Sequence, residues 1–125
     1  MKAVFILAAM VLLSHFVLAQ GGKAEPKRIE FAPGKNSAAL SGSLRGAQEM
    51  EYVFAVKKGQ TVTVKNPANG AFDFRIFSNE NEVETEFDSS PTLTLDIPAD
   101  GDYLFFVRRK VGRGLARFRM TLTVR

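Results

Sequence analysis

Residues 117–124 read Arg-Phe-Arg-Met-Thr-Leu-Thr-Val, and this stretch alternates polar and apolar side chains without a break. A period of two places each set on its own face of an extended chain, whereas a helix repeats every 3.6 residues. The stretch therefore predicts a β-strand with one face in an apolar core and the other in solvent.

The same alternation recurs in short runs back toward the N-terminus, with Gly, Pro and Asn between the runs, as in Pro33-Gly34 and Asn69-Gly70. The apolar faces of these runs are Ile29 and Phe31; Leu40 and Leu44; Tyr52, Phe54 and Val56; Val62 and Val64; Phe72, Phe74 and Ile76; Leu93, Leu95 and Ile97; and Tyr103, Phe105 and Val107. No sustained helical period occurs after residue 20. The pattern predicts an all-β fold, an antiparallel β-sandwich of about seven to nine short strands.

The first nineteen residues are typical of a cleaved signal peptide. Met1-Lys2 gives a basic start, Ala3–Ala19 is almost wholly apolar, and Val17-Leu18-Ala19 offers the small residues that signal peptidase reads. A membrane anchor is the alternative, but no basic cluster follows the run. We expect cleavage before Gln20, a flexible tail at 20–27, and a single β-sandwich domain at 28–125, exported to the periplasm or secreted by a bacterium.

The missing residue types limit the chemistry of the exported chain. The sequence has no Cys, and its only His is His15, inside the predicted signal peptide. The exported chain would then have no thiol, no His-based catalytic centre and no His or Cys metal ligands. We expect a protein that is not an enzyme and needs no cofactor or metal.

The acidic stretch Glu80–Asp88 allows more than one interpretation. Its carboxylates could bind calcium or act as a glycosidase acid and base pair. However, Glu82, Glu84 and Glu86 alternate along an extended chain and lack the Asp, Asn and Gly pattern of a tight calcium loop. We favour an edge strand whose charges discourage pairing with other chains.

Two glycine-containing segments are candidate binding loops. The basic segment Arg108–Gly114 lies between two predicted strands, so we expect a hairpin loop that offers guanidinium groups to carboxylates or phosphates. Nucleic acid is disfavoured by export and by the lack of aromatic residues in the loop. A solvated turn is the alternative. Ser41–Gly46 is either a second binding loop or a strand end whose glycines serve geometry.

Several of these segments, taken in order, resemble the periplasmic inhibitors of goose-type (g-type) lysozyme. The resemblance rests on Ile29–Phe31 with Pro33-Gly34, on Ser41–Gly46, on Tyr52–Gln60, on Ile97–Tyr103 and on the late arginine segment. Parts of the same pattern resemble bacterial pre-peptidase C-terminal domains, which are also β-sandwiches.

The resemblance to the inhibitors implies a site. It implies that two arginines four residues apart in the late loop bind the enzyme. Arg109 and Arg113 match them if this chain lacks two residues that the family has between Val107 and Arg109. It also implies contacts from the early loop, which here contains Ser41, Gly42, Arg45 and Gly46. The family tyrosine that follows the glycine is absent, because Ala47 stands there.

The resemblance therefore implies an exported protein that binds and inhibits g-type lysozyme by inserting basic loops into its active-site cleft, and so protects peptidoglycan. Its expected partner is a protein, with no nucleic acid and no membrane contact after signal cleavage. A non-inhibitory binding module that contacts polysaccharide or protein is the alternative. The sequence leaves the oligomeric state open.

Overall fold

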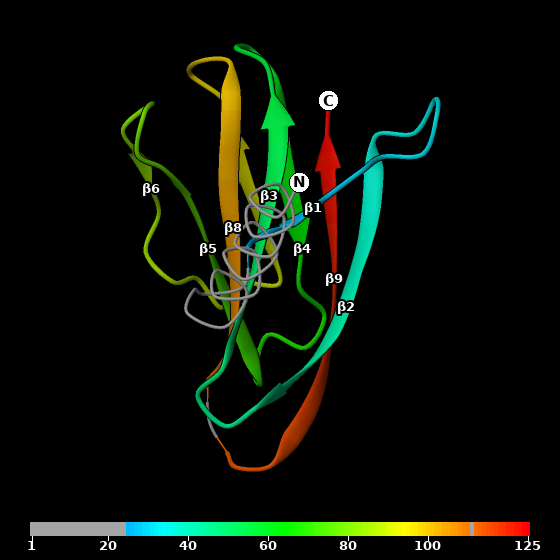
Figure 1. Cartoon of the computed structure of the whole chain (residues 1–125), viewed down its shortest axis with the longest axis vertical. Coiled ribbons are helices and arrows are strands. Elements are labelled where there is room, and N and C mark those ends of the chain that lie inside the picture. The colour runs from blue at the N-terminus through cyan, green and yellow to red at the C-terminus, as the bar shows by residue number, and fades with distance from the viewer. Residues whose placement is uncertain (1–24, 111) are drawn as a thin grey trace, which may run out of the picture.

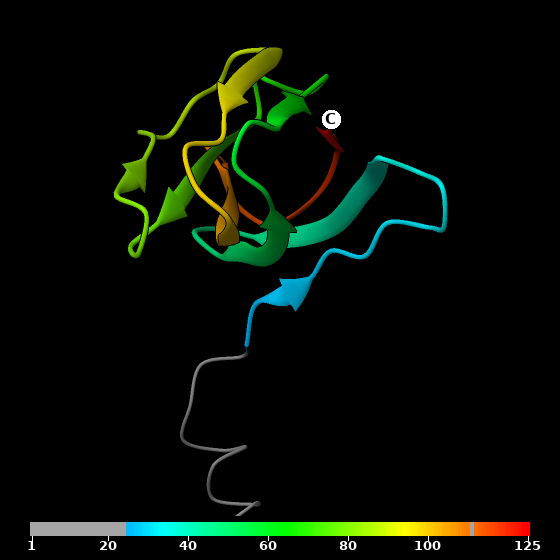
Figure 2. The same cartoon turned by 90° about the horizontal axis from the view of Figure 1, so that it is seen from above.

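The structure, a computed structural model, describes residues 25–110 and 112–125, which form nine strands in two sheets (Figures 1 and 2). The strands are β1 (Lys27–Arg28), β2 (Ser37–Arg45), β3 (Glu49–Val56), β4 (Thr61–Lys65), β5 (Phe72–Ser78), β6 (Val83–Glu84), β7 (Thr92–Asp96), β8 (Gly101–Arg109) and β9 (Leu115–Val124). The predicted β-sandwich is confirmed. The predicted signal peptide lies outside the described residues. Within the described part, no helix is long and apolar enough to cross a membrane.

The two sheets have the strand orders β1-β3-β8-β5-β6 and β2-β9-β4-β7. β1 runs parallel to β3, and the other strand pairings are antiparallel. β8 and β9 each lie between two partners inside their own sheet. Long antiparallel strands of this kind can bury one face and leave the other in water, which is the arrangement that the alternation predicts.

The core lies between the sheets and consists of the predicted apolar faces. From the first sheet, Phe54, Phe74 and Phe105 are fully buried, and from the second, Met120 and Leu122 are fully buried. Aromatic rings contact one another within and between the sheets: the Phe74 and Phe105 centroids lie 5.6 Å apart, and those of Phe72 and Phe118 lie 5.9 Å apart. Packing of these large rings contributes much of the apolar area that stabilises a domain of this size.

The acidic stretch forms the outer edge of the first sheet, as the edge-strand interpretation predicts. β6 is the last strand in the order, and it contains only two residues. Glu84 forms an ion pair with Arg75 of β5 at 3.5 Å. A short, charged edge presents few backbone groups to another chain.

The predicted hairpin at Arg108–Gly114 is wrong, because β8 and β9 belong to different sheets. The connection between them crosses from one sheet to the other at the end of the sandwich that lies at the bottom of Figure 1. Alternation marks both strands as half-buried but does not say which neighbours each strand pairs with, so the sequence could not separate a hairpin from a crossing.

We expect core and surface leucines of β9 to differ sharply in their effect on stability. Leu122→Ala should lower the free energy of unfolding by about 2–5 kcal/mol, because it leaves a cavity at a fully buried position. Leu115→Ala at the exposed end of the same strand should change it by less than about 0.5 kcal/mol. Urea unfolding measures both. Equal losses would contradict the described packing.

Candidate functional site

Two of the connections that cross between the sheets meet at one end of the sandwich. They are the β2–β3 turn, residues 46–48, and the β8–β9 connection, of which residues 110 and 112–114 are described; together we call them the tip. The Gly46 N–H donates a hydrogen bond to the Gly114 carbonyl at 3.1 Å. The two candidate loops of the sequence therefore touch through their glycines.

The β2–β3 turn is held by its own polar groups. The Gln48 side-chain oxygen accepts a hydrogen bond from the Arg45 N–H at 2.8 Å, and the Gln48 N–H donates to the Arg45 carbonyl at 3.2 Å. Gly46 has φ +59°, a left-handed conformation that most side chains disfavour. These constraints keep the turn short and leave the Arg45 side chain exposed.

Arg109 holds the β8–β9 connection in place through hydrogen bonds to its backbone. Its Nη1 donates hydrogen bonds to the Arg113 carbonyl at 2.9 Å and to the Gly114 carbonyl at 2.7 Å. Gly112 has φ +103°, and a Cβ there would lie 2.6 Å from Arg109 Nη2, so another residue at this position would strain the backbone and displace the guanidinium. Arg109 is thus a positioning residue that fixes the loop.

Arg108 is anchored to the outer face of the first sheet. Its guanidinium makes two hydrogen bonds with the carboxylate of Asp73, at 2.9 and 3.0 Å, and lies 3.7 Å from the centre of the Phe87 ring. The hydrogen bonding of Arg108 to the Asp73 carboxylate, above all, raises the pKa of Arg108 above its ordinary value. This bidentate pair fixes the end of β8 immediately before the tip.

Exposed side chains at the tip and at the strand ends beside it include Arg45, Lys110, Arg113 and Leu115. Arg45 and Leu115 are directly opposed in the β2–β9 register, and Leu115 is 60% exposed. The sequence does carry a signal for Leu115, because it lies two residues before Arg117 and therefore on the same outward face, but Leu115 is not among the predicted site residues. The tip therefore offers guanidinium groups for carboxylates beside one apolar contact.

Ser41 and Gly42 do not belong to the tip, because they lie within β2. Ser41 faces outward opposite Arg119, and Gly42 packs beneath the Phe118 ring, where a Cβ would lie 2.8 Å from a ring carbon. Gly42 therefore serves the geometry of the strand, because its missing side chain leaves room for the Phe118 ring.

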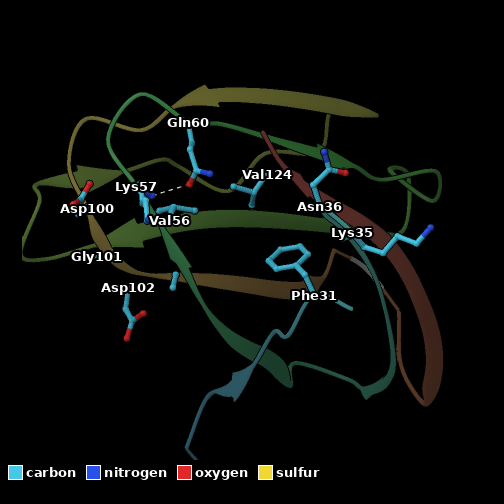
Figure 3. A pocket seen from close by; sticks show the side chains of 11 residues that line it. Phe31, Lys35, Asn36, Val56, Lys57, Gln60, Asp100, Gly101, Asp102 and Val124 are labelled. Carbon is cyan, nitrogen blue, oxygen red and sulfur yellow. Dashed lines mark hydrogen bonds between the residues drawn. The ribbon is translucent and has the colours of Figure 1, made fainter. Parts of the chain in front are cut away.

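A cavity of about 730 Å³ lies at the opposite end of the sandwich, around Phe31, Gln60 and Val124 (Figure 3). Two of its polar side chains are already used by the local turns. The Gln60 side-chain oxygen accepts from the Lys57 N–H at 2.8 Å, and Asp100 accepts from the Lys58 N–H at 2.7 Å. We therefore take the tip as the candidate site.

Residues of the metal-binding types do not gather anywhere in the described part of the chain. Within residues 25–110 and 112–125, no three Asp, Glu or His side chains lie close enough together to hold an ion.

Comparison with known proteins gives matches among solved structures. No protein-family model matches the chain, and no curated protein sequence matches it. PliG from Aeromonas hydrophila, a periplasmic lysozyme inhibitor of g-type lysozyme, is 25% identical with a TM-score of 0.68, and the match covers 80% of this chain and 96% of that one. PliG from Salmonella Typhimurium, described in the same words, is 25% identical with a TM-score of 0.65, covering 82% and 100%.

A second kind of protein shares the fold. The pre-peptidase C-terminal domain of a Bacillus anthracis collagenase is 16% identical with a TM-score of 0.55, and the match covers 84% of this chain and 99% of that domain. At this identity the likeness concerns the fold alone. Both resemblances seen in the sequence are thus confirmed at the level of structure.

We expect Arg109 and Arg113 to differ in what they do for the loop. Arg109→Ala removes two hydrogen bonds from a charged donor and should speed amide hydrogen exchange at Gly46 by about tenfold. Arg113→Ala keeps the backbone carbonyl that Arg109 uses, and should leave that exchange rate unchanged. Exchange followed by NMR measures both variants. Equal acceleration in the two would contradict the assignment of Arg109 as the positioning residue.

Proposed function

We propose that this protein is an exported inhibitor of g-type lysozyme that presents its tip to the active-site cleft of the enzyme. The observation that carries the proposal is the meeting of the β2–β3 turn and the β8–β9 connection at one end, with Arg113 and Arg45 exposed there. Support comes also from the likeness to two periplasmic inhibitors of g-type lysozyme at 25% identity over about four fifths of the chain.

The chemistry of the tip suits a lysozyme cleft, because such clefts depend on a carboxylic acid and are otherwise shaped for sugars. Arg113 pairs with a carboxylate in the cleft, and Arg45 adds a second cation beside it. Arg109 acts indirectly, since its guanidinium is already hydrogen-bonded to the Arg113 and Gly114 carbonyls. A loop that is already ordered loses little conformational entropy when it binds.

The apolar part of this interface differs from that implied by the family resemblance. Ala47 stands where a tyrosine is expected, and a methyl group cannot supply the contact area of a large ring. Leu115, exposed next to the same turn through its pairing with Arg45, supplies the apolar contact instead. The protein thus acts by occupying the cleft and performs no bond cleavage of its own.

The proposed location is the periplasm, where the enzyme would otherwise reach peptidoglycan. The predicted signal peptide and the periplasmic location of the two inhibitors that the structure resembles both support it. The alternative of a non-inhibitory binding module rests on a likeness of fold alone.

Inhibition should depend on Arg113 far more than on an exposed arginine elsewhere. In a cell-wall lysis assay with g-type lysozyme, Arg113→Ala should raise the half-inhibitory concentration by about thirtyfold or more, because it leaves a cleft carboxylate unpaired. Arg125→Ala, at the opposite end of β9, serves as the matched control and should inhibit like the wild type. Complete lysis at a large excess of inhibitor would refute the proposed function, and equal potency of the two variants would exclude the tip as the site.

Binding should weaken as salt is added, because the contacts at the tip are charged. Calorimetric titration of g-type lysozyme with the inhibitor measures the affinity directly and avoids the effect of salt on lysis itself. Leu115→Ala should lower the affinity at every salt concentration while leaving the salt dependence as it is. An affinity that does not respond to salt would contradict a charged interface.

A further inference from the structure

A row of basic side chains crosses the outer face of the β2-β9-β4-β7 sheet, beyond the tip. We call these residues, Arg45, Arg117, Arg119 and Lys65, the basic stripe. In the β2–β9 register Arg117 lies opposite Ser43, one outward position from Arg45, and in the β4–β9 register Lys65 lies opposite Thr121, one outward position from Arg119. The stripe therefore runs diagonally over β2, β9 and β4.

The spacing of the stripe follows from sheet geometry. Arg117 and Arg119 are two residues apart on one strand, which places their Cα atoms about 6.5–7 Å apart. Diagonal neighbours on adjacent strands, such as Arg119 and Lys65, lie about 7–8 Å apart. The stripe thus offers cations at steps of about 7 Å, which suits a chain of repeated anionic groups.

Acidic side chains of the described structure do not neutralise the stripe. The outward positions of these four strands include one acid, Asp96, which lies at the far end of β7 and accepts a hydrogen bond from Thr61. The ion pairs of the described residues, Arg28–Asp102, Arg75–Glu84 and Arg108–Asp73, all lie on the other sheet. Like charges held together in this way repel one another, so a bound anion would be favourable.

A groove of about 500 Å³ runs beside the centre of the stripe. Ser41, Arg117 and Arg119 line it along the strands, and Pro67 and Ala68 form a wall. The wall exists because β4 ends at Lys65, where the chain turns while β9 continues. The turn is fixed by buried Asn66, whose side-chain amide donates to the Phe72 carbonyl at 2.9 Å. An anionic group in this groove would meet two guanidinium groups and a hydroxyl.

Hydroxyl side chains cover most of the remaining face. They are Ser37, Ser41 and Ser43 of β2, Thr121 and Thr123 of β9, Thr61 and Thr63 of β4, and Thr92 and Thr94 of β7. Ser37 and Thr123 are hydrogen-bonded to each other at 2.7 Å. Hydroxyls both donate and accept hydrogen bonds, as the hydroxyls of sugars require.

The outward positions of these strands do not suit two other polyanions. They carry no aromatic side chain on which nucleic acid bases could stack. Leu115 is the one large apolar side chain among them, at a corner of the face, so the face has no apolar patch to enter a lipid surface.

We propose that the outer face of the β2-β9-β4-β7 sheet binds an acidic polysaccharide, with sugar carboxylates on Arg117 and Arg119 in the groove. The neighbouring serines and threonines hydrogen-bond to sugar hydroxyls, and Arg45 and Lys65 extend the contact along the polymer. The centre of this surface, at Arg117 and Arg119, lies outside the tip, and Arg45 is the one residue named for both surfaces. The proposal does not depend on lysozyme inhibition.

Affinity electrophoresis of the exported, processed protein through polygalacturonate tests the proposal. Polygalacturonate carries a carboxylate on every sugar, and its fully methyl-esterified form is the uncharged control of the same backbone. We expect retardation by the acid form only, lost with added salt. Arg117→Gln with Arg119→Gln should weaken the binding by about five- to tenfold, since two exposed charged contacts disappear.

The matched control removes the same charge at the other end of the sandwich. Lys57→Gln with Lys58→Gln should bind polygalacturonate like the wild type, and Lys65→Gln alone should show an intermediate loss. Thermal unfolding confirms that each variant folds. Inhibition of g-type lysozyme by the Arg117 and Arg119 double variant should be unchanged, which separates this surface from the tip.

Several results would overturn the proposal. Equal retardation by the esterified form would exclude the sugar carboxylates as the groups that are bound. Equal losses of affinity in the two double variants would mean that net charge alone drives binding. Tighter binding to a single-stranded DNA oligonucleotide or to phosphatidylglycerol vesicles than to polygalacturonate would assign the face to another class of polyanion.

Discussion

The antiparallel pairings of β3 with β8 and of β2 with β9 are the constraint on which the rest of the structure depends. Their registers place Glu49 opposite Arg108 and Arg45 opposite Leu115, so the β2–β3 and β8–β9 connections form at the same end. The hydrogen bond from Gly46 to Gly114 joins connections that lie more than sixty residues apart in the sequence. Because these pairings also bury the large aromatic side chains, the forces that stabilise the core set the shape of the tip.

Neighbouring arginines have different physical roles at this end of the molecule. Arg108 is bound to buried Asp73 and fixes the strand end, Arg109 binds the carbonyls of its own loop, and Arg113 is exposed. A side chain that is not already hydrogen-bonded within the protein can pair fully with a partner. Arg108 and Arg109 instead hold the backbone in place, which lowers the entropy lost on binding. The outer face of the second sheet adds further exposed cations, whose spacing is set by the regular geometry of the strands.

The sequence predicted the parts of the structure that follow from local patterning. Inward faces such as Tyr103–Phe105–Val107 are buried as expected, and the acidic stretch contributes a short edge strand. Pairing partners depend on contacts far apart in the chain, so the crossing from β8 to β9 was predicted as a hairpin. For the same reason the sequence did not indicate that Ser41 lies beside Arg119 or that Leu115 lies opposite Arg45. The hydrogen bonds of Arg109 to its own loop are local, but they depend on the loop conformation around Gly112, which alternation does not specify.

Hydrogen exchange of the protein mixed with g-type lysozyme, read by mass spectrometry, tests the central claim most directly. It reports which backbone segments become protected on binding, whatever residues carry the energy. We predict slower exchange at residues 45–48 and 109–115, with no change around the cavity at the other end, at 31–36 and 57–60. Protection confined to that other end, or no protection at concentrations that inhibit the enzyme, would contradict a tip that enters the cleft.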